Sequence, residues 1–238
     1  LPLVSVEALP DGRVRLTQER FLPAGAVKQA PQVWQIPMTL KFDDGSGPRE
    51  QNVLLTQASQ VFDLGVKKLD WIAPNGGAWG YYRWKLAPGA MVALADGAAK
   101  TLDARERMEY AYDARALLEV GALRADGYLQ MLPRFLRDPE PLVVAAAMDG
   151  LEGIRDPLIT PDLEEPFARY VRAAITPSVE RFGRTARPGE AETVSLIRPR
   201  LLQSLADEGR DPGTRAFGDS VAAVMLKDPS AVDAGLYI

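Results

Sequence analysis

The sequence predicts two parts in succession, a small β-sandwich over residues 1–87 and an array of packed α-helices over residues 88–238. Before Pro88-Gly89, apolar residues alternate with polar ones, which is typical of half-buried strands. After this dipeptide they recur every three or four residues, which is typical of amphipathic helices. Turn sequences divide both parts into short segments, as a chain of many small elements requires.

The clearest strand is expected between Trp34 and Phe42, where apolar residues occupy every second position. Pro37 has no backbone N–H to donate, so it favours an edge strand or a bulge. Short strands separated by regular turns predict a β-sandwich. Further strands are expected at residues 4–6, 14–16, 51–55, 61–62, 71–72 and 82–86.

The clearest helix carries apolar residues on one face between Leu163 and Ile175, and similar stripes occur at residues 128–136 and 217–225. Asp103 followed by Glu106 predicts a capping box at a helix start, and Gly121 fits the position just past that helix end. Short breaks between the helices favour antiparallel neighbours, so we expect a HEAT/armadillo-like α-helical array.

The end of the array is expected to be truncated. Pro229 is predicted to begin another helix near residue 230, yet the chain ends at Leu236-Tyr237-Ile238. A terminal repeat normally presents a polar face that shields the stack, and this apolar end does not. We therefore expect the natural protein to continue.

The composition excludes several kinds of site. The 238 residues include no histidine and no cysteine, which excludes histidine-dependent triads, histidine-type zinc sites and thiol nucleophiles but leaves carboxylate, lysine and tyrosine chemistry open. We predict no catalytic site, metal site or cofactor in this chain. Paired acids such as Glu164 and Glu165 are better explained as favourable charges at a helix start. The net charge of −4 comes from interspersed charges, and no apolar run approaches about 18 residues. We therefore expect no nucleic-acid or membrane partner, and a soluble monomer with a cytoplasmic location as the default.

A dense aromatic cluster comprises Trp71, Trp79, Tyr81, Tyr82 and Trp84. It has two interpretations, a stacking platform for sugars or packing within the core and between domains. Packing is favoured because aromatic side chains bury large areas, and alternation places Tyr82 and Trp84 on one face.

Charged residues in both parts are interpreted as structural. Arg107 and Asp113 are six residues apart and do not face each other along one helix. We therefore expect each to pair with another element.

Several motifs in this order resemble the aminopeptidase N family of zinc metallopeptidases. Gln18-Glu19-Arg20-Phe21 resembles the opening of the β-sandwich domain that follows the family's catalytic domain. Gly80-Tyr81-Tyr82-Arg83 resembles the segment that closes that domain, although Trp84 departs from the usual small β-branched residue. Arg107, Asp113 and Gly121 resemble the spacing in the first helices of the family's C-terminal domain. The structural motif residues are thus Gln18, Glu19, Arg20, Phe21, Tyr82, Arg83, Arg107, Asp113 and Gly121.

The resemblance implies a function for the chain. The family's catalytic domain carries a His-Glu-x-x-His zinc motif and a Gly-x-Met-Glu-Asn loop, and neither occurs here. The chain would then be an inactive, non-catalytic C-terminal portion that shapes and covers the cleft. Zinc would belong to the parent's own catalytic domain, its partner, and peptide substrates would reach this chain through the parent.

Two further hypotheses follow. Arg169, Arg172 and Arg198 are candidate peptide-contacting residues, because basic side chains on a helical cover could hold a peptide carboxylate. The alternative function is a stand-alone HEAT-like protein-interaction scaffold with an attached β-domain.

Overall fold

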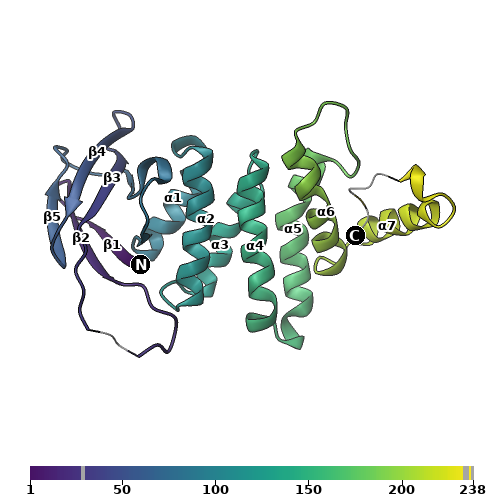
Figure 1. Ribbon diagram of the computed structural model, residues 1–238, viewed down its shortest axis with the longest axis horizontal. Helices are drawn as coiled ribbons and strands as arrows, with labels where there is room; N and C mark the ends of the chain where they lie inside the picture. Colours follow the sequence, from purple (N-terminus) through teal and green to yellow (C-terminus); the bar gives the residue numbers. More distant parts are fainter. Residues whose placement is uncertain (28–29, 233–235, 237–238) are drawn as a thin grey trace. The chain divides into compact units, whose positions relative to one another are not determined.

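A computed structural model describes residues 1–27, 30–232 and 236, with strands followed by helices along the chain (Figure 1). The chain divides into two compact units, Leu1–Met131 and Leu132–Ile238. The change from strand to helix falls between Lys85 and Pro88, beside the predicted limit at residue 87. The compact units divide within a later helix instead, because the first helices pack on the strands.

The first unit contains seven strands in two sheets. One sheet has the order β5-β2-β1-β7 and the other has the order β4-β3-β6. Neighbouring strands are antiparallel except for β1 and β7, which are parallel. All the expected strands are present. Their bounds are β1 Pro2–Ala8, β2 Arg13–Arg20, β3 Ile36–Asp43, β4 Arg49–Leu55, β5 Ser59–Asp63, β6 Trp71–Ala73 and β7 Arg83–Lys85.

Strand β3 shows how the sequence tolerates Pro37. The strand lies between β4 and β6, but β6 pairs only with residues 41–43. At Pro37 the strand therefore has a neighbour on one side only, where it pairs with Leu54 of β4. The strand was predicted to begin at Trp34 but begins at Ile36, because the backbone of Trp34 bonds to the Gln18 side chain instead.

The described residues form seven α-helices, and the ends of α2 match the sequence prediction. Asp103 and Glu106 close a capping box at its start. At its end Gly121 has φ +73°, and hydrogen bonds from Gly121 to Leu118 and from Ala122 to Leu117 form a Schellman motif. The helices are α1 Pro88–Thr101, α2 Ala104–Glu119, α3 Ala125–Leu136, α4 Pro141–Leu158, α5 Glu164–Phe182, α6 Glu192–Asp207 and α7 Pro212–Met225.

The core of the first unit joins strands to helices. The rings of Trp84 on β7 and Tyr110 on α2 lie 4.9 Å apart between centroids, and both side chains are buried. The Tyr110 hydroxyl donates to the carbonyl oxygen of Met91 on α1. Tyr110 thus links both helices to the last strand.

In the second unit, α6 packs against α4, α5 and α7. On the expected stripe of α5, Phe167, Val171 and Ile175 are buried, whereas Leu163 is exposed. The stripe on α7 is not buried within the described chain, since Val224 and Met225 are exposed.

The last described residues form no α-helix. Pro229–Ala231 is a single 3₁₀ turn rather than the start of the expected helix. Of the predicted apolar end only Leu236 is described, and Tyr237 and Ile238 lie outside the described residues. Within the described part of the chain, no helix combines the length and apolar character needed to cross a bilayer.

Two glycines with similar backbone angles provide a test of the close contact between the turn before β2 and the backbone of Val66. Gly12 has φ +78° and Gly65 has φ +67°, so alanine is strained at either position. A Cβ at Gly12 would lie 1.9 Å from the carbonyl oxygen of Val66, whereas a Cβ at Gly65 would meet nothing within 4 Å. We expect Gly65→Ala to cost about 1–2 kcal/mol of unfolding free energy and Gly12→Ala to cost clearly more. Urea denaturation of both variants measures this, and equal losses would contradict the described approach of Val66.

Candidate functional site

The buried side chain of Gln18 on β2 holds two loop segments. Its Nε2 donates to the carbonyl oxygens of Trp34, at 2.9 Å, and Gln57, at 3.0 Å. Its Oε1 accepts from the backbone nitrogen of Trp34 at 2.8 Å. Because a buried amide needs these partners, Gln18 fixes the chain just before β3 and just before β5.

The next three motif residues also make structural contacts. The Arg20 guanidinium lies 5.5 Å from the centre of the Trp34 ring and donates to Gln32. Glu19 lies 3.4 Å from the Lys85 ammonium on β7. The backbone nitrogen of Phe21 donates to the carbonyl oxygen of Leu1 at 3.0 Å. The motif thus organises the β-strands around β1 and β2.

Three acidic side chains on α2 meet the β-strands and their loops. The first is Glu106, which is buried. Its carboxylate accepts from Lys41 Nζ on β3 at 2.7 Å, from Gly77 N at 2.8 Å and from Asp103 N at 2.7 Å. One carboxylate therefore joins the start of α2, the second half of β3 and the connection between β6 and β7.

The second is Asp113, whose side chain is 0% exposed. It forms an ion pair with Arg83 on β7 at 2.5 Å and accepts from the Trp84 backbone nitrogen at 3.3 Å. The expected pairing of Asp113 with another element is confirmed. Arg107 also bonds outside its helix, donating from Nη1 to the carbonyl oxygen of Leu102 at the end of α1, at 2.7 Å.

The third is Glu109, which accepts a hydrogen bond from the side chain of Asn75. Asn75 also stabilises the loop before β7. Its Nδ2 donates to the carbonyl oxygen of Gly80 at 3.1 Å, and its Oδ1 accepts from the backbone nitrogen of Gly80 at 2.8 Å. The Tyr82 hydroxyl donates to the carbonyl oxygen of Pro74 at 2.7 Å. The loop is therefore held at both ends.

Burial controls the protonation of these acids. It raises the pKa of Glu109 to about 8, assisted by the nearby charge of Asp113 and opposed by the hydrogen bond from Asn75. Burial also raises the pKa of Asp113 to about 7, opposed by the ion pair with Arg83. Burial thus disfavours the charged form of both carboxyl groups, whereas the Arg83 guanidinium favours it at Asp113.

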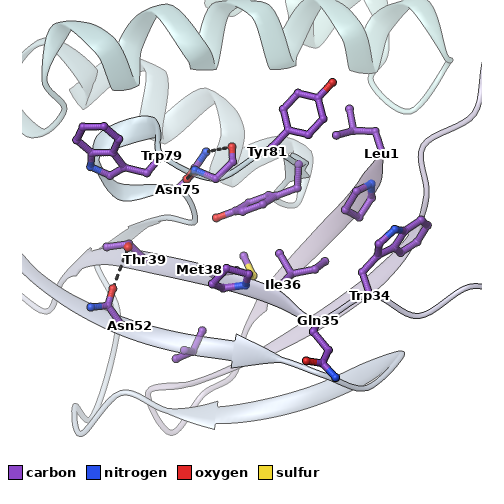
Figure 2. A pocket seen from close by; sticks show the side chains of 15 residues that line it. Leu1, Trp34, Gln35, Ile36, Met38, Thr39, Asn52, Asn75, Trp79 and Tyr81 are labelled. Atoms are coloured by element: carbon purple, nitrogen blue, oxygen red, sulfur yellow. Dashed lines mark hydrogen bonds between the residues drawn. The ribbon is translucent and has the colours of Figure 1, made fainter.

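A cavity of about 580 Å³ lies between β3 and the loop of residues 74–82 that joins β6 to β7, called the Asn75 loop below (Figure 2). None of the fifteen residues that line it has a charged side chain. Its polar groups include Gln35 and the hydrogen-bonded pair Thr39 and Asn52, whose oxygens are 2.8 Å apart. Figure 2 shows Trp79 and Tyr81 at the upper rim, on the loop opposite β3.

The aromatic cluster has three environments, and Trp71 on β6 is half-buried. Tyr82 and Trp84 are buried, which confirms the packing interpretation and their shared face for these two residues. Trp79 is 77% exposed and Tyr81 is 90% exposed, so neither belongs to the core. Alternation in the sequence placed Tyr82 and Trp84 on one face, but it could not show that Trp79 and Tyr81 are uncovered.

The three candidate peptide-contacting arginines lie in the second unit and differ in exposure. Arg169 and Arg172 on α5 both approach Glu165, at 3.6 Å and 3.2 Å. Arg198 on α6 has a side chain that is 3% exposed, and it donates to Glu190 and to the carbonyl oxygens of Phe182 and Gly183. The Arg198 guanidinium is therefore bonded inside the unit.

Two of the α2 acids are already engaged by partners within the first unit. Glu106 and Asp113 are occupied by cations and backbone N–H groups. Within residues 1–27, 30–232 and 236, no group of three or more acidic side chains could hold a metal ion. The donor set therefore does not fit zinc, which prefers histidine, cysteine and clustered carboxylates.

Sequence reasoning did not identify Glu109 or the partnership of Glu106 with Lys41. The available signal was the spacing of Glu106, Glu109 and Asp113, which places three acids along one side of a helix. That side also carries Tyr110 and Leu117, which are buried. Acids that share a helix side with apolar residues indicate buried charge that needs partners.

The sequence profile of the ERAP1-like C-terminal domain family matches residues 71–236, and the chain belongs to this family. The expected resemblance to the aminopeptidase N family is confirmed by this match and by similarity to proteins named aminopeptidases.

Three aminopeptidases illustrate this similarity. The chain is 23% identical to puromycin-sensitive aminopeptidase of Caenorhabditis elegans over 225 residues, which are 91% of the chain and 24% of that protein. It is 23% identical to aminopeptidase 2 of Candida albicans over 239 residues, 99% of the chain and 26% of that protein. It is 27% identical to aminopeptidase M1-A of Oryza sativa subsp. japonica over 222 residues, 88% of the chain and 24% of that protein. The chain thus spans about a quarter of these relatives.

The buried ion pair can be tested with an exposed pair on the same helix. Asp113→Ala leaves the Arg83 guanidinium partly buried without its carboxylate, and we expect a loss of about 3–5 kcal/mol in unfolding free energy. Glu119→Ala removes the exposed partner of Arg115, and it should cost less than about 1 kcal/mol. Denaturant unfolding measures both variants. Similar losses would contradict the role of Asp113 as the link between α2 and β7.

The raised pKa of Glu109 predicts a pH dependence of stability. Between its ordinary pKa of 4.5 and about 8, the folded chain keeps a proton that the unfolded chain releases. Unfolding free energy should therefore fall as pH rises through this window. The raised pKa of Asp113 also lowers stability as pH rises, so in Glu109→Gln the unfolding free energy should still fall with pH, but less steeply. Glutamine at this position can still accept the hydrogen bond from Asn75. Urea midpoints at both ends of the window test this, and an unchanged decline in the variant would refute it.

Proposed function

We propose that this chain is the non-catalytic C-terminal part of a zinc aminopeptidase, which removes N-terminal residues from peptides. The observation that carries the proposal is the match of residues 71–236 to the ERAP1-like C-terminal domain family. Similarity to three proteins named aminopeptidases, over most of this chain, supports it further.

The chemistry of the described residues fits a supporting role. The α2 acids are engaged in internal contacts, and the donor set does not suit zinc. Zinc therefore belongs, in this proposal, to a catalytic domain in the rest of the parent protein. That domain is the chain's partner, and peptide substrates reach the chain through it.

The proposal extends to architecture. The strands of residues 1–87 form a β-sandwich domain, and residues 88–238 form a HEAT/armadillo-like helical domain that shapes and covers the active-site cleft. The packing of α6 against α4, α5 and α7 supports stacked helices. The proposed parent is cytoplasmic and monomeric. Similarity to aminopeptidases favours an aminopeptidase part over the alternative function, a stand-alone interaction scaffold.

Arg169 and Arg172 are the residues through which the helical domain would hold peptides. Both approach the one carboxylate of Glu165, and Arg172 also donates to the carbonyl oxygen of Gly209, whereas Arg169 has a side chain that is 62% exposed. A peptide carboxylate would find a charge-assisted hydrogen bond at this place. Arg198 was proposed with them, but its donors are bonded to Glu190 and to backbone carbonyls, so its contribution is to hold α6.

The proposed function is tested by comparing two proteins, the full-length product of the parent coding sequence and the 238-residue chain. We expect the full-length protein to bind zinc and to hydrolyse aminoacyl amides, and the chain alone to do neither. Metal analysis and amide hydrolysis measure the two properties. Aminopeptidase activity in the chain alone, or its absence from the full-length protein, would overturn the proposal.

Charge reversal tests the peptide contact. In the full-length protein, Arg169→Glu with Arg172→Glu should raise KM for peptides by about tenfold or more, because charge-assisted hydrogen bonds contribute about 1.5–3 kcal/mol. The KM for single-residue amides should not change, because they do not reach α5. Arg124→Glu, at an exposed arginine of the first unit, is the matched control. An equal rise for both substrate types would refute the contact.

A further inference from the structure

We propose that the uncharged cavity between the Asn75 loop and β3 is the docking site for an apolar segment of the parent's catalytic domain, with Trp79 and Tyr81 as its anchors. This inference rests on the proposed function, because it takes its partner from there. It adds which surface of the chain meets that domain, and through which side chains.

The two rim aromatics are unusually exposed for their size. Trp79 is 77% exposed and Tyr81 is 90% exposed, and both lie on one short loop at the cavity. Large aromatic side chains are the residues that most often carry the binding energy of an interface, because they bury much area in few conformations. Two such side chains at the rim of one cavity indicate a binding surface.

The loop is organised before any partner binds. The Asn75 side chain holds both backbone groups of Gly80, and Glu106 accepts from the Gly77 nitrogen at 2.8 Å. The Arg105 guanidinium lies 4.3 Å from the centre of the Trp79 ring and orients it. A surface held in this way loses little conformational freedom on binding, so more of its contact energy becomes affinity.

The lining defines the chemistry of the occupant. None of the lining side chains is charged, so a charged group inside the cavity would lose water without gaining an opposite charge there, and the Arg105 guanidinium is engaged with the Trp79 ring. An apolar side chain suits the exposed ring of Pro37, and the exposed amides of Gln35 and Asn52 can bond a backbone group. The cavity volume of about 580 Å³ accepts more than one side chain.

The position of β1 points to the upstream domain as the source of this segment. Leu1 lines the cavity, and β1 begins at the next residue, Pro2. A domain joined ahead of Leu1 would therefore enter the structure at the cavity itself. Such a link gives a neighbouring segment an effective concentration of about millimolar, which favours it over free partners.

Photo-crosslinking in the full-length protein identifies the occupant. Tyr81 is replaced by the photo-reactive residue benzoylphenylalanine, and the cross-linked peptides are sequenced by mass spectrometry. We expect the cross-link to reach an apolar segment of the catalytic domain within the same chain. Val61, which is 41% exposed on β5 of the other sheet, carries the same probe as a control and should not reach that segment.

A second measurement tests the energetic role of the anchors. In the full-length protein, Trp79→Ala with Tyr81→Ala should raise amide hydrogen exchange in the cross-linked segment by about tenfold or more, as expected for the loss of interface anchors. Val61→Ala should leave that exchange unchanged. In the 238-residue chain, the double variant should unfold at the same urea concentration as the unsubstituted chain, because both side chains are exposed. Equal midpoints exclude misfolding as the cause of the faster exchange.

The outcomes separate this inference from the proposed function. A full-length protein without zinc or aminopeptidase activity would refute the proposed function, and the docking inference with it. An active enzyme in which Tyr81 cross-links to a second copy, another protein or nothing would overturn the docking inference alone. Unchanged hydrogen exchange in the double variant of an active enzyme would do the same.

Discussion

The first unit depends on buried charges of α2 that face β-strands and their loops. Asp113 pairs with Arg83 on β7 at 2.5 Å, and Glu106 pairs with Lys41 on β3 at 2.7 Å. A buried carboxylate without such a partner is costly, so these contacts restrict α2 to one position on the strands. β7 and β3 belong to different sheets, so the two ion pairs connect α2 to both sheets of the first unit.

The same contacts explain why strands and helices form one compact unit. Tyr110 packs on Trp84 and bonds to Met91, so α1, α2 and β7 share a core. The division between compact units then falls in α3, although the secondary structure changes near residue 87. Glu109 extends the network to Asn75 and to the loop that carries Trp79 and Tyr81. The helix that stabilises the strands therefore also presents the proposed docking surface.

Much of the local structure could be predicted from local rules. Alternation identified the strands, Asp103 and Glu106 identified the start of α2, and Gly121 identified its end. The motif at Gln18–Phe21 pointed to the family, but not to the role of Gln18 in bonding both backbone groups of Trp34. That role joins residues far apart in sequence, and no local pattern specifies which backbone groups lack a partner. For the same reason the burial of Arg198 was not foreseen.

By itself, the sequence determined the order of strands and helices, the absence of histidine and cysteine, and the motifs of an aminopeptidase C-terminal domain. These depend on periodicity, composition and short spacings, which are properties of neighbouring residues. Only the tertiary structure decided that Glu106, Glu109 and Asp113 are held by the strands and their loops, and that Trp79 and Tyr81 stand outside the core. Burial and pairing depend on which distant segments meet, because the pKa of a carboxyl group and the exposure of a ring are set by the atoms packed around them.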